Sequence, residues 1–111
     1  MFDNLTFQSV PGSNQRDQIR LLALSTCGFC RRGQEFLESH GLAYEFIHLD
    51  TLEPEVKAQI KQQFKEEYGE SLSYPALIVN GRNHTIGYVK RRWEELLGIP
   101  HEDEVVNAEI N

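Results

Sequence analysis

The chain has 111 residues, which is enough for one domain built around one hydrophobic core. Hydrophobic residues make up 40% of it and charged residues 25%, a balance typical of globular proteins. The formal net charge of −6 argues against a general nucleic-acid binder, and no stretch approaches the length of a transmembrane span. Because the first residues also lack the basic start and apolar centre of a secretion signal, we expect a cytoplasmic protein in a reducing compartment.

The first part of the chain predicts a strand, a helix and a second strand behind an N-terminal extension. Residues 1–17 are polar and contain the turn signal Pro11-Gly12, so we interpret them as the extension, which could include a short strand near Leu5–Val10. The apolar run IRLLALS then predicts a buried strand, and GFCRRGQEFLESHG predicts an amphipathic helix that ends at Gly41. The alternating segment Ala43–Leu49 predicts the next strand.

The second part of the chain predicts a helix, a hairpin and a last helix. The segment PEVKAQIKQQFKEEYG has Pro54 at its start and apolar residues four apart, a pattern typical of a helix. PALIVN and HTIG predict two strands joined by a turn at Asn80-Gly81, because this dipeptide is a strong hairpin signal. In YVKRRWEELLG, Val89 and Trp93 begin a series of apolar residues at helical spacing, so we expect Trp93 in the core.

These elements follow one another in the order β-α-β-α-β-β-α. The β-α-β unit implies a parallel first pair of strands, and the hairpin implies an antiparallel last pair. We therefore expect an α/β fold with a four-stranded mixed sheet flanked by three helices. In this interpretation, residues 18–98 form the domain, residues 1–17 precede it as a short extension, and residues 99–111 form an acidic C-terminal tail.

The chain has two cysteines, Cys27 and Cys30, and they form a Cys-x-x-Cys motif at the predicted junction of the first strand and the first helix. The free N–H groups and the dipole of a helix N-terminus stabilise an anion, and a thiolate at Cys27 is such an anion. Cys30 lies one turn further into the helix and should be the less exposed thiol. The pair predicts a thiol–disulfide exchange site in which Cys27 attacks a disulfide and Cys30 releases the product.

Two other interpretations of the cysteines are a half-built zinc site and an inert pair. Zinc requires four ligands, and the sequence has neither a second Cys-x-x-Cys motif nor clustered histidines. A zinc site would therefore need a dimer or distant ligands, and we expect no metal ligands in this chain.

Three segments, STCGFC, SYPALIVNG and IGYVKRRWEELLG, together resemble the glutaredoxin family of the thioredoxin fold over about residues 19–98. The resemblance implies a thiol–disulfide oxidoreductase with Cys27 as the nucleophile and Cys30 as the resolving thiol. It also implies that Pro75 is cis and lies against the active site, that Tyr74 offers its backbone to the substrate, and that Gly87 permits close approach at the last helix. We expect substrate contacts from Phe29, Arg31, Tyr74, Pro75, Gly87 and Tyr88.

The sequence departs from the typical glutathione-using members at three places. Gly28-Phe29 stands between the cysteines where those members have Pro-Tyr, and Tyr74 stands before the proline where they have Val. Gly87 is followed by Tyr88 instead of by a second glycine and an acidic residue. Glutathione is therefore only a candidate co-substrate. The Gly-Tyr pair resembles the Gly-Phe of glutaredoxin-like electron donors whose partner is of the thioredoxin-reductase type.

The expected partners are a disulfide-containing protein or glutathione, with a thioredoxin-reductase-like protein as a further candidate donor, and we expect a monomer that contacts neither nucleic acid nor membrane. We expect no tightly bound cofactor, because the dithiol is itself the redox centre. The basic residues Lys90, Arg91 and Arg92 start the last helix and could attract acidic partners or form a solvated face. Two functions of another class stay open. They are an iron–sulfur cluster carrier that uses Cys27 as a ligand, and a non-catalytic binding module with the same fold.

Overall fold

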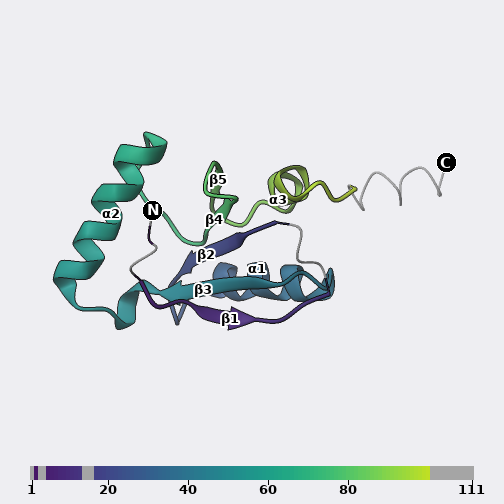
Figure 1. Cartoon of the computed structure of the whole chain (residues 1–111), viewed down its shortest axis with the longest axis horizontal. Coiled ribbons are helices and arrows are strands. Elements are labelled where there is room, and N and C mark those ends of the chain that lie inside the picture. Colours follow the sequence, from purple (N-terminus) through teal and green to yellow (C-terminus); the bar gives the residue numbers. More distant parts are fainter. Residues whose placement is uncertain (1, 3–4, 14–16, 101–111) are drawn as a thin grey trace.

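The computed structural model describes residues 2, 5–13 and 17–100, and the predicted acidic tail lies almost entirely outside the described residues. Strands, helices and one 3₁₀ helix, η1, follow one another along these residues (Figure 1). In chain order they are β1 (Gln8–Val10), β2 (Ile19–Ala23), α1 (Gly28–Ser39), β3 (Tyr44–His48), η1 (Leu49–Thr51), α2 (Pro54–Tyr68), β4 (Ala76–Val79), β5 (Asn83–Ile86) and α3 (Lys90–Leu97).

The strands form one mixed sheet in the order β1-β3-β2-β4-β5. The β2 and β3 strands pair in parallel and β4 and β5 pair antiparallel, as the sequence predicts; the β1–β3 and β2–β4 pairs are antiparallel as well. The sheet has five strands, so the prediction of four was wrong by one. The additional strand is β1, whose Gln8 and Val10 pair with Phe46 and Tyr44 of β3. It lies within the segment Leu5–Val10, where the sequence indicated a short strand, but this segment was not counted in the sheet because Gln8 and Ser9 are polar and exposed at its edge.

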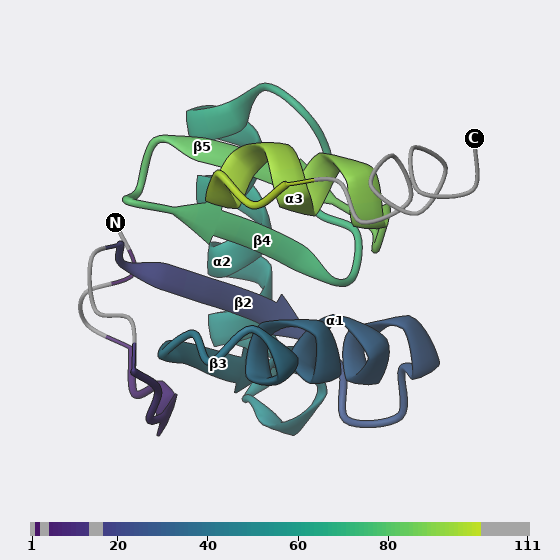
Figure 2. The same ribbon diagram turned by 90° about the vertical axis from the view of Figure 1, so that its right-hand side faces the viewer.

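Helices cover both faces of the sheet. Figure 2 shows α1 and α3 in front of the strands and α2 behind them. Successive side chains of β2 point to opposite faces of the sheet. Leu21 packs in the apolar cluster under α1 and α3, and Leu22 packs in the cluster under α2. Trp93 of α3 is fully buried in the first cluster, which confirms its predicted place in the core. Val89 departs from the prediction: it precedes α3 as the N-cap and is 49% exposed.

The turn between β4 and β5 confirms the predicted hairpin. Val79 pairs with Asn83 across the loop, in which Asn80 and Gly81 have left-handed φ angles of +57° and +70° and the N–H of Arg82 donates to the carbonyl of Val79 at 3.3 Å. In the part of the chain that the structure describes, the helices are too short or too polar to cross a membrane.

Candidate active site

Cys27 is held at the N-cap of α1 by the turn that follows β2. Its N–H donates to the carbonyl of Leu24 at 3.3 Å, and its own carbonyl accepts the N–H of Arg31 at 3.1 Å. Its Sγ accepts the N–H of Cys30 at 3.2 Å, in the position that a serine or aspartate oxygen usually takes at a helix start. The sulfur is half-buried, and a thiolate here would receive a backbone hydrogen bond together with the positive end of the helix dipole.

Cys30 is the buried member of the pair, as the sequence predicts, with 1% of its surface exposed. Both cysteines are free thiols in this structure. Burial, followed by the hydrogen bond with the Cys27 sulfur, raises the pKa of the Cys30 thiol to about 12. The pair therefore combines an accessible sulfur with a neighbouring thiol that holds its proton strongly.

Asp50 fixes the loop before Cys27 and was missed by sequence reasoning. Its carboxylate accepts the N–H of Ser25 at 3.0 Å and also the Ser25 hydroxyl. The hydroxyl and then the N–H of Ser25 lower the pKa of this carboxyl group. The positions of Ser25 and Asp50 in the sequence could have indicated this contact. Both residues lie just beyond the carboxyl ends of β2 and β3, and these ends come together because the two strands are parallel neighbours.

The segment before β4 lies next to the loop that carries Cys27. The Tyr74–Pro75 peptide bond is cis, which confirms the expectation for Pro75. Pairing of Leu22 with Ala76 places this segment beside the carboxyl end of β2, where the loop to Cys27 begins. The Tyr74 hydroxyl is buried and forms no hydrogen bond with any described residue.

The segment before α3 is joined to the segment before β4 by a hydrogen bond. The N–H of Gly87 donates to the carbonyl of Pro75 at 2.7 Å, and the carbonyl of Gly87 accepts the indole N–H of Trp93 at 3.0 Å. Gly87 has a φ of +79°, a conformation that favours glycine. Tyr88 packs edge-on against Trp93, with ring centroids 5.0 Å apart, and lies 6.1 Å from the ring of Phe36.

An aromatic and basic surface borders the cysteines. Phe29 is 58% exposed, as expected for a residue between the cysteines, and the Arg32 guanidinium lies 5.4 Å from the centroid of its ring. Arg31, the arginine predicted to contact substrate, is exposed and contacts Cys27 through its main chain. Arg32 is thus the arginine that stacks on Phe29, and the sequence offered no means of choosing between the two.

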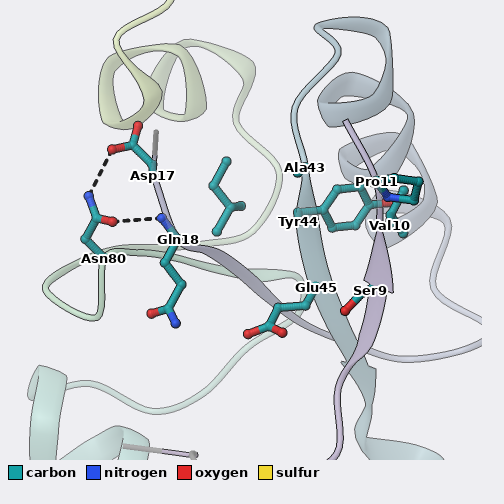
Figure 3. A pocket seen from close by; sticks show the side chains of 10 residues that line it. Ser9, Val10, Pro11, Asp17, Gln18, Ala43, Tyr44, Glu45 and Asn80 are labelled. Atoms are coloured by element: carbon teal, nitrogen blue, oxygen red, sulfur yellow. Dashed lines mark hydrogen bonds between the residues drawn. The ribbon is translucent and has the colours of Figure 1, made fainter. Parts of the chain in front are cut away.

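A hollow of about 370 Å³ continues this surface between α1 and the segment before α3. Its lining includes Arg32, His40, Tyr88 and Lys90. A second hollow, of about 650 Å³, lies at the other end of β2 and is lined by Gln18, Tyr44, Glu45 and Asn80 among others (Figure 3). This second hollow is remote from the cysteines. The Asn80 side chain there donates a hydrogen bond to the carboxylate of Asp17 and accepts one from the N–H of Gln18.

Within the described ranges, no group of His, Cys, Asp and Glu side chains is arranged to hold a metal ion.

Comparisons with known proteins identify the family of the chain and agree with its fold. The family model described as Glutaredoxin matches residues 19–84 of the chain, and a search of curated proteins finds no match. Among solved structures, the glutaredoxin of Methanosarcina mazei Go1 is 22% identical, with a TM-score of 0.71 over 84% of this chain and 88% of that one. The glutaredoxin grx-1 of Archaeoglobus fulgidus is 29% identical, with a TM-score of 0.64 over 75% and 88% of the two chains. The methanoredoxin of Methanosarcina acetivorans is 28% identical, with a TM-score of 0.64 over 74% and 85%.

Proposed function

The chain belongs to the glutaredoxin family, and on that premise we propose that it is a thiol–disulfide oxidoreductase that reduces disulfides with the Cys27–Cys30 dithiol. The observation that carries the proposal is the geometry of the pair. Cys27 is half-buried at the N-cap of α1, where its sulfur accepts the backbone N–H of Cys30 at 3.2 Å, and Cys30 offers a second thiol one helical turn away. This arrangement suits a nucleophile followed by a resolving thiol.

The reaction has two steps. First, the Cys27 thiolate attacks a substrate disulfide, whose S–S bond breaks, and one substrate sulfur leaves while the other joins Cys27 as a mixed disulfide. Next, Cys30 loses its proton to solvent and its thiolate attacks Cys27, which forms the Cys27–Cys30 disulfide and expels the second substrate sulfur with the electron pair. The leaving sulfurs take up protons from water, so the substrate gains two electrons and the enzyme dithiol loses two.

The surface around Cys27 favours a protein disulfide as substrate. Phe29 and Val89 are the large apolar side chains that the described part of the chain leaves exposed, and they stand at the starts of α1 and α3. Exposed apolar side chains beside a reactive sulfur suit a protein partner that covers them. Arg32 and Lys90 outnumber the one carboxylate, Glu35, in the lining of the adjoining hollow, so a partner with acidic groups near its disulfide would be attracted to it.

We propose that the oxidised dithiol is regenerated either by glutathione or by a reductase of the thioredoxin-reductase type. The Tyr88-Val89-Lys90 sequence after Gly87 favours the reductase, since it supplies no acidic residue for the ammonium group of glutathione. In either case the dithiol serves as the redox centre without a prosthetic group. We further propose that the protein acts as a monomer in the cytoplasm.

A coupled assay of NADPH oxidation tests this function. One reaction contains glutathione, glutathione reductase and a small mixed disulfide, and the other contains thioredoxin reductase and a protein disulfide. We expect turnover that requires Cys27, with Cys27→Ser as the inactive control. Absence of Cys27-dependent turnover in both reactions would refute the proposed function, and the reaction that proceeds identifies the donor.

A variant of Phe29 tests the preference for protein substrates. We expect Phe29→Ala to raise KM for the protein disulfide several-fold and to leave KM for the small disulfide nearly unchanged, because only the larger substrate covers the ring. Equal changes in the two KM values would show that Phe29 does not contact the protein partner.

A further inference from the structure

The Tyr74 hydroxyl is a buried polar group that the reaction described above does not use. It is inaccessible to solvent and has no hydrogen-bond partner among the described residues, although the ring itself is only half-buried. Buried polar side-chain atoms are nearly always hydrogen-bonded in folded proteins. A hydroxyl that stays unpartnered beside a reactive site is therefore a candidate for a bond formed only during the reaction.

The sheet register places Tyr74 next to the loop that carries the cysteines. Ala76 pairs with Leu22 across the antiparallel β2–β4 ladder, and the cis Tyr74–Pro75 bond directly precedes Ala76, so Tyr74 lies beside the end of β2 where the loop to Cys27 begins. The Leu24 carbonyl accepts the N–H of Cys27 at 3.3 Å, and the Leu24 backbone is one of the groups that act to lower the pKa of the Cys30 thiol. Tyr74 also packs against the apolar cluster that contains Cys30.

The charges around the hydroxyl keep it a donor. Burial, then the carboxylate of Asp50 and then the Cys30 sulfur raise the pKa of Tyr74, so its proton stays on the phenol oxygen. Asp50 is itself occupied by two hydrogen bonds from Ser25. The group in this neighbourhood that gains most from a donor is the Cys30 sulfur once it has lost its proton, because burial disfavours that thiolate.

We propose that the Tyr74 hydroxyl donates a hydrogen bond to the Cys30 thiolate while that thiolate attacks the mixed disulfide on Cys27. This role rests on the proposed function, because it concerns the second step of the exchange. Tyr74 keeps its own proton throughout, and the bonds formed and broken are those of the resolving step. The hydroxyl lowers the barrier by stabilising a buried negative charge that the ground-state thiol does not carry.

Reaction with the aromatic disulfide 5,5′-dithiobis(2-nitrobenzoate) separates the two steps, since each step releases one coloured thiolate. The first phase reports attack by Cys27, and the second reports resolution by Cys30. For Tyr74→Phe we expect the first phase to change by less than about twofold and the second to slow about tenfold, the effect of losing one hydrogen bond to a charged group. Tyr68→Phe is the matched control, because the Tyr68 hydroxyl bonds to Gly81 in the distant hairpin turn.

The outcomes of this experiment distinguish the role of Tyr74 from the function itself. An unchanged second phase in Tyr74→Phe, or equal slowing of both phases, would overturn the role of the hydroxyl. Absence of both phases in the unmodified protein would instead overturn the proposed function.

A second measurement needs no disulfide exchange. In a Cys27→Ser background, the rate at which iodoacetamide alkylates Cys30 reports the fraction of Cys30 that is thiolate. Asp50 is retained in this background, so the remaining charged neighbour of the hydroxyl is constant. We expect the added Tyr74→Phe substitution to slow alkylation about tenfold across the neutral to mildly alkaline range, because a donor to the thiolate has been removed. If Cys30 were alkylated as fast with Tyr74→Phe as in Cys27→Ser alone, or faster, the proposal would be overturned, even if the enzyme proved inactive.

Discussion

The contact between Gly33 of α1 and Trp93 of α3 offers a sharp test of the packing beneath the site. A methyl group on Gly33 would lie 2.4 Å from Cη2 and 3.0 Å from Cζ3 of the Trp93 ring. Carbon atoms that are not bonded pack at about 3.5 Å or more, so the ring or the helix would have to move by about 1 Å. The ring is fully buried, and its N–H is bonded to the carbonyl of Gly87.

Three effects determine how much Gly33→Ala changes the free energy of unfolding. Overpacking of a core costs about 1–3 kcal/mol, and weakening of the bond from Trp93 to Gly87 adds about 0.5–1.5 kcal/mol. Replacing glycine by alanine inside a helix returns about 0.5–1 kcal/mol. Together these effects should lower the free energy of unfolding by about 0.5–4 kcal/mol, centred on about 2 kcal/mol, which lowers Tm by several degrees in a domain of this size.

Urea denaturation measures this change, provided that the m-values of the variants agree. Gly28→Ala is the matched control, because it changes another glycine of α1 and its added methyl group would have nothing within 4 Å. We expect its free energy of unfolding to stay within about 0.5 kcal/mol of that of the unmodified protein. If Gly33→Ala were as stable as Gly28→Ala, the close contact with Trp93 would be wrong.

Three further changes probe other contacts. Gly12→Ala sets a methyl group 2.3 Å from the backbone nitrogen of Ala43, so we expect β1 to loosen and the urea midpoint to fall; an unchanged midpoint would refute this packing. Gly87→Ala meets no neighbour within 4 Å, so its φ of +79° alone should cost about 1–2 kcal/mol in the same assay, and a smaller loss would mean that no strain is present. In Asp50→Asn a carboxylate is removed; hydrogen bonds from Ser25 lower the pKa of this carboxyl group below its ordinary value of 3.8. The stability that the carboxylate contributes is present above pH 3.8 and is lost as the pH falls through the pKa of the folded state. The Tm difference from the unmodified protein should therefore vanish in acid, and a constant difference would contradict the assignment.

Local patterns predicted most of the fold. The hairpin at Asn80-Gly81 depends on two adjacent residues that tolerate positive φ, and the location of Cys27 depends on a strand that ends a few residues before a helix. Val89 was misplaced for a local reason too, because its spacing suits a helix that in fact begins one residue later, at Lys90. These features are determined within a few residues of chain.

The contacts that the sequence did not reveal join residues that are distant in the chain. Ser25 and Asp50 meet only because β2 and β3 are parallel neighbours, and the short strand near Leu5–Val10 joins the sheet only because it pairs with β3. The burial of the Tyr74 hydroxyl likewise depends on how the segment before β4 packs against the two apolar clusters. No periodicity in the sequence encodes such contacts, since each depends on the arrangement of the whole sheet.

The most direct test of the central claim is to trap the mixed disulfide on Cys27. Cys30→Ser and Cys27→Ser variants would each be incubated with an oxidised protein disulfide, and the products would be weighed by intact-mass spectrometry without reductant. The mechanism predicts a covalent adduct on the Cys30→Ser variant, located at Cys27 and released by dithiothreitol, and none on the Cys27→Ser variant. An adduct on neither variant, or equally on both, would contradict the assignment of Cys27 as the nucleophile and Cys30 as the resolving thiol.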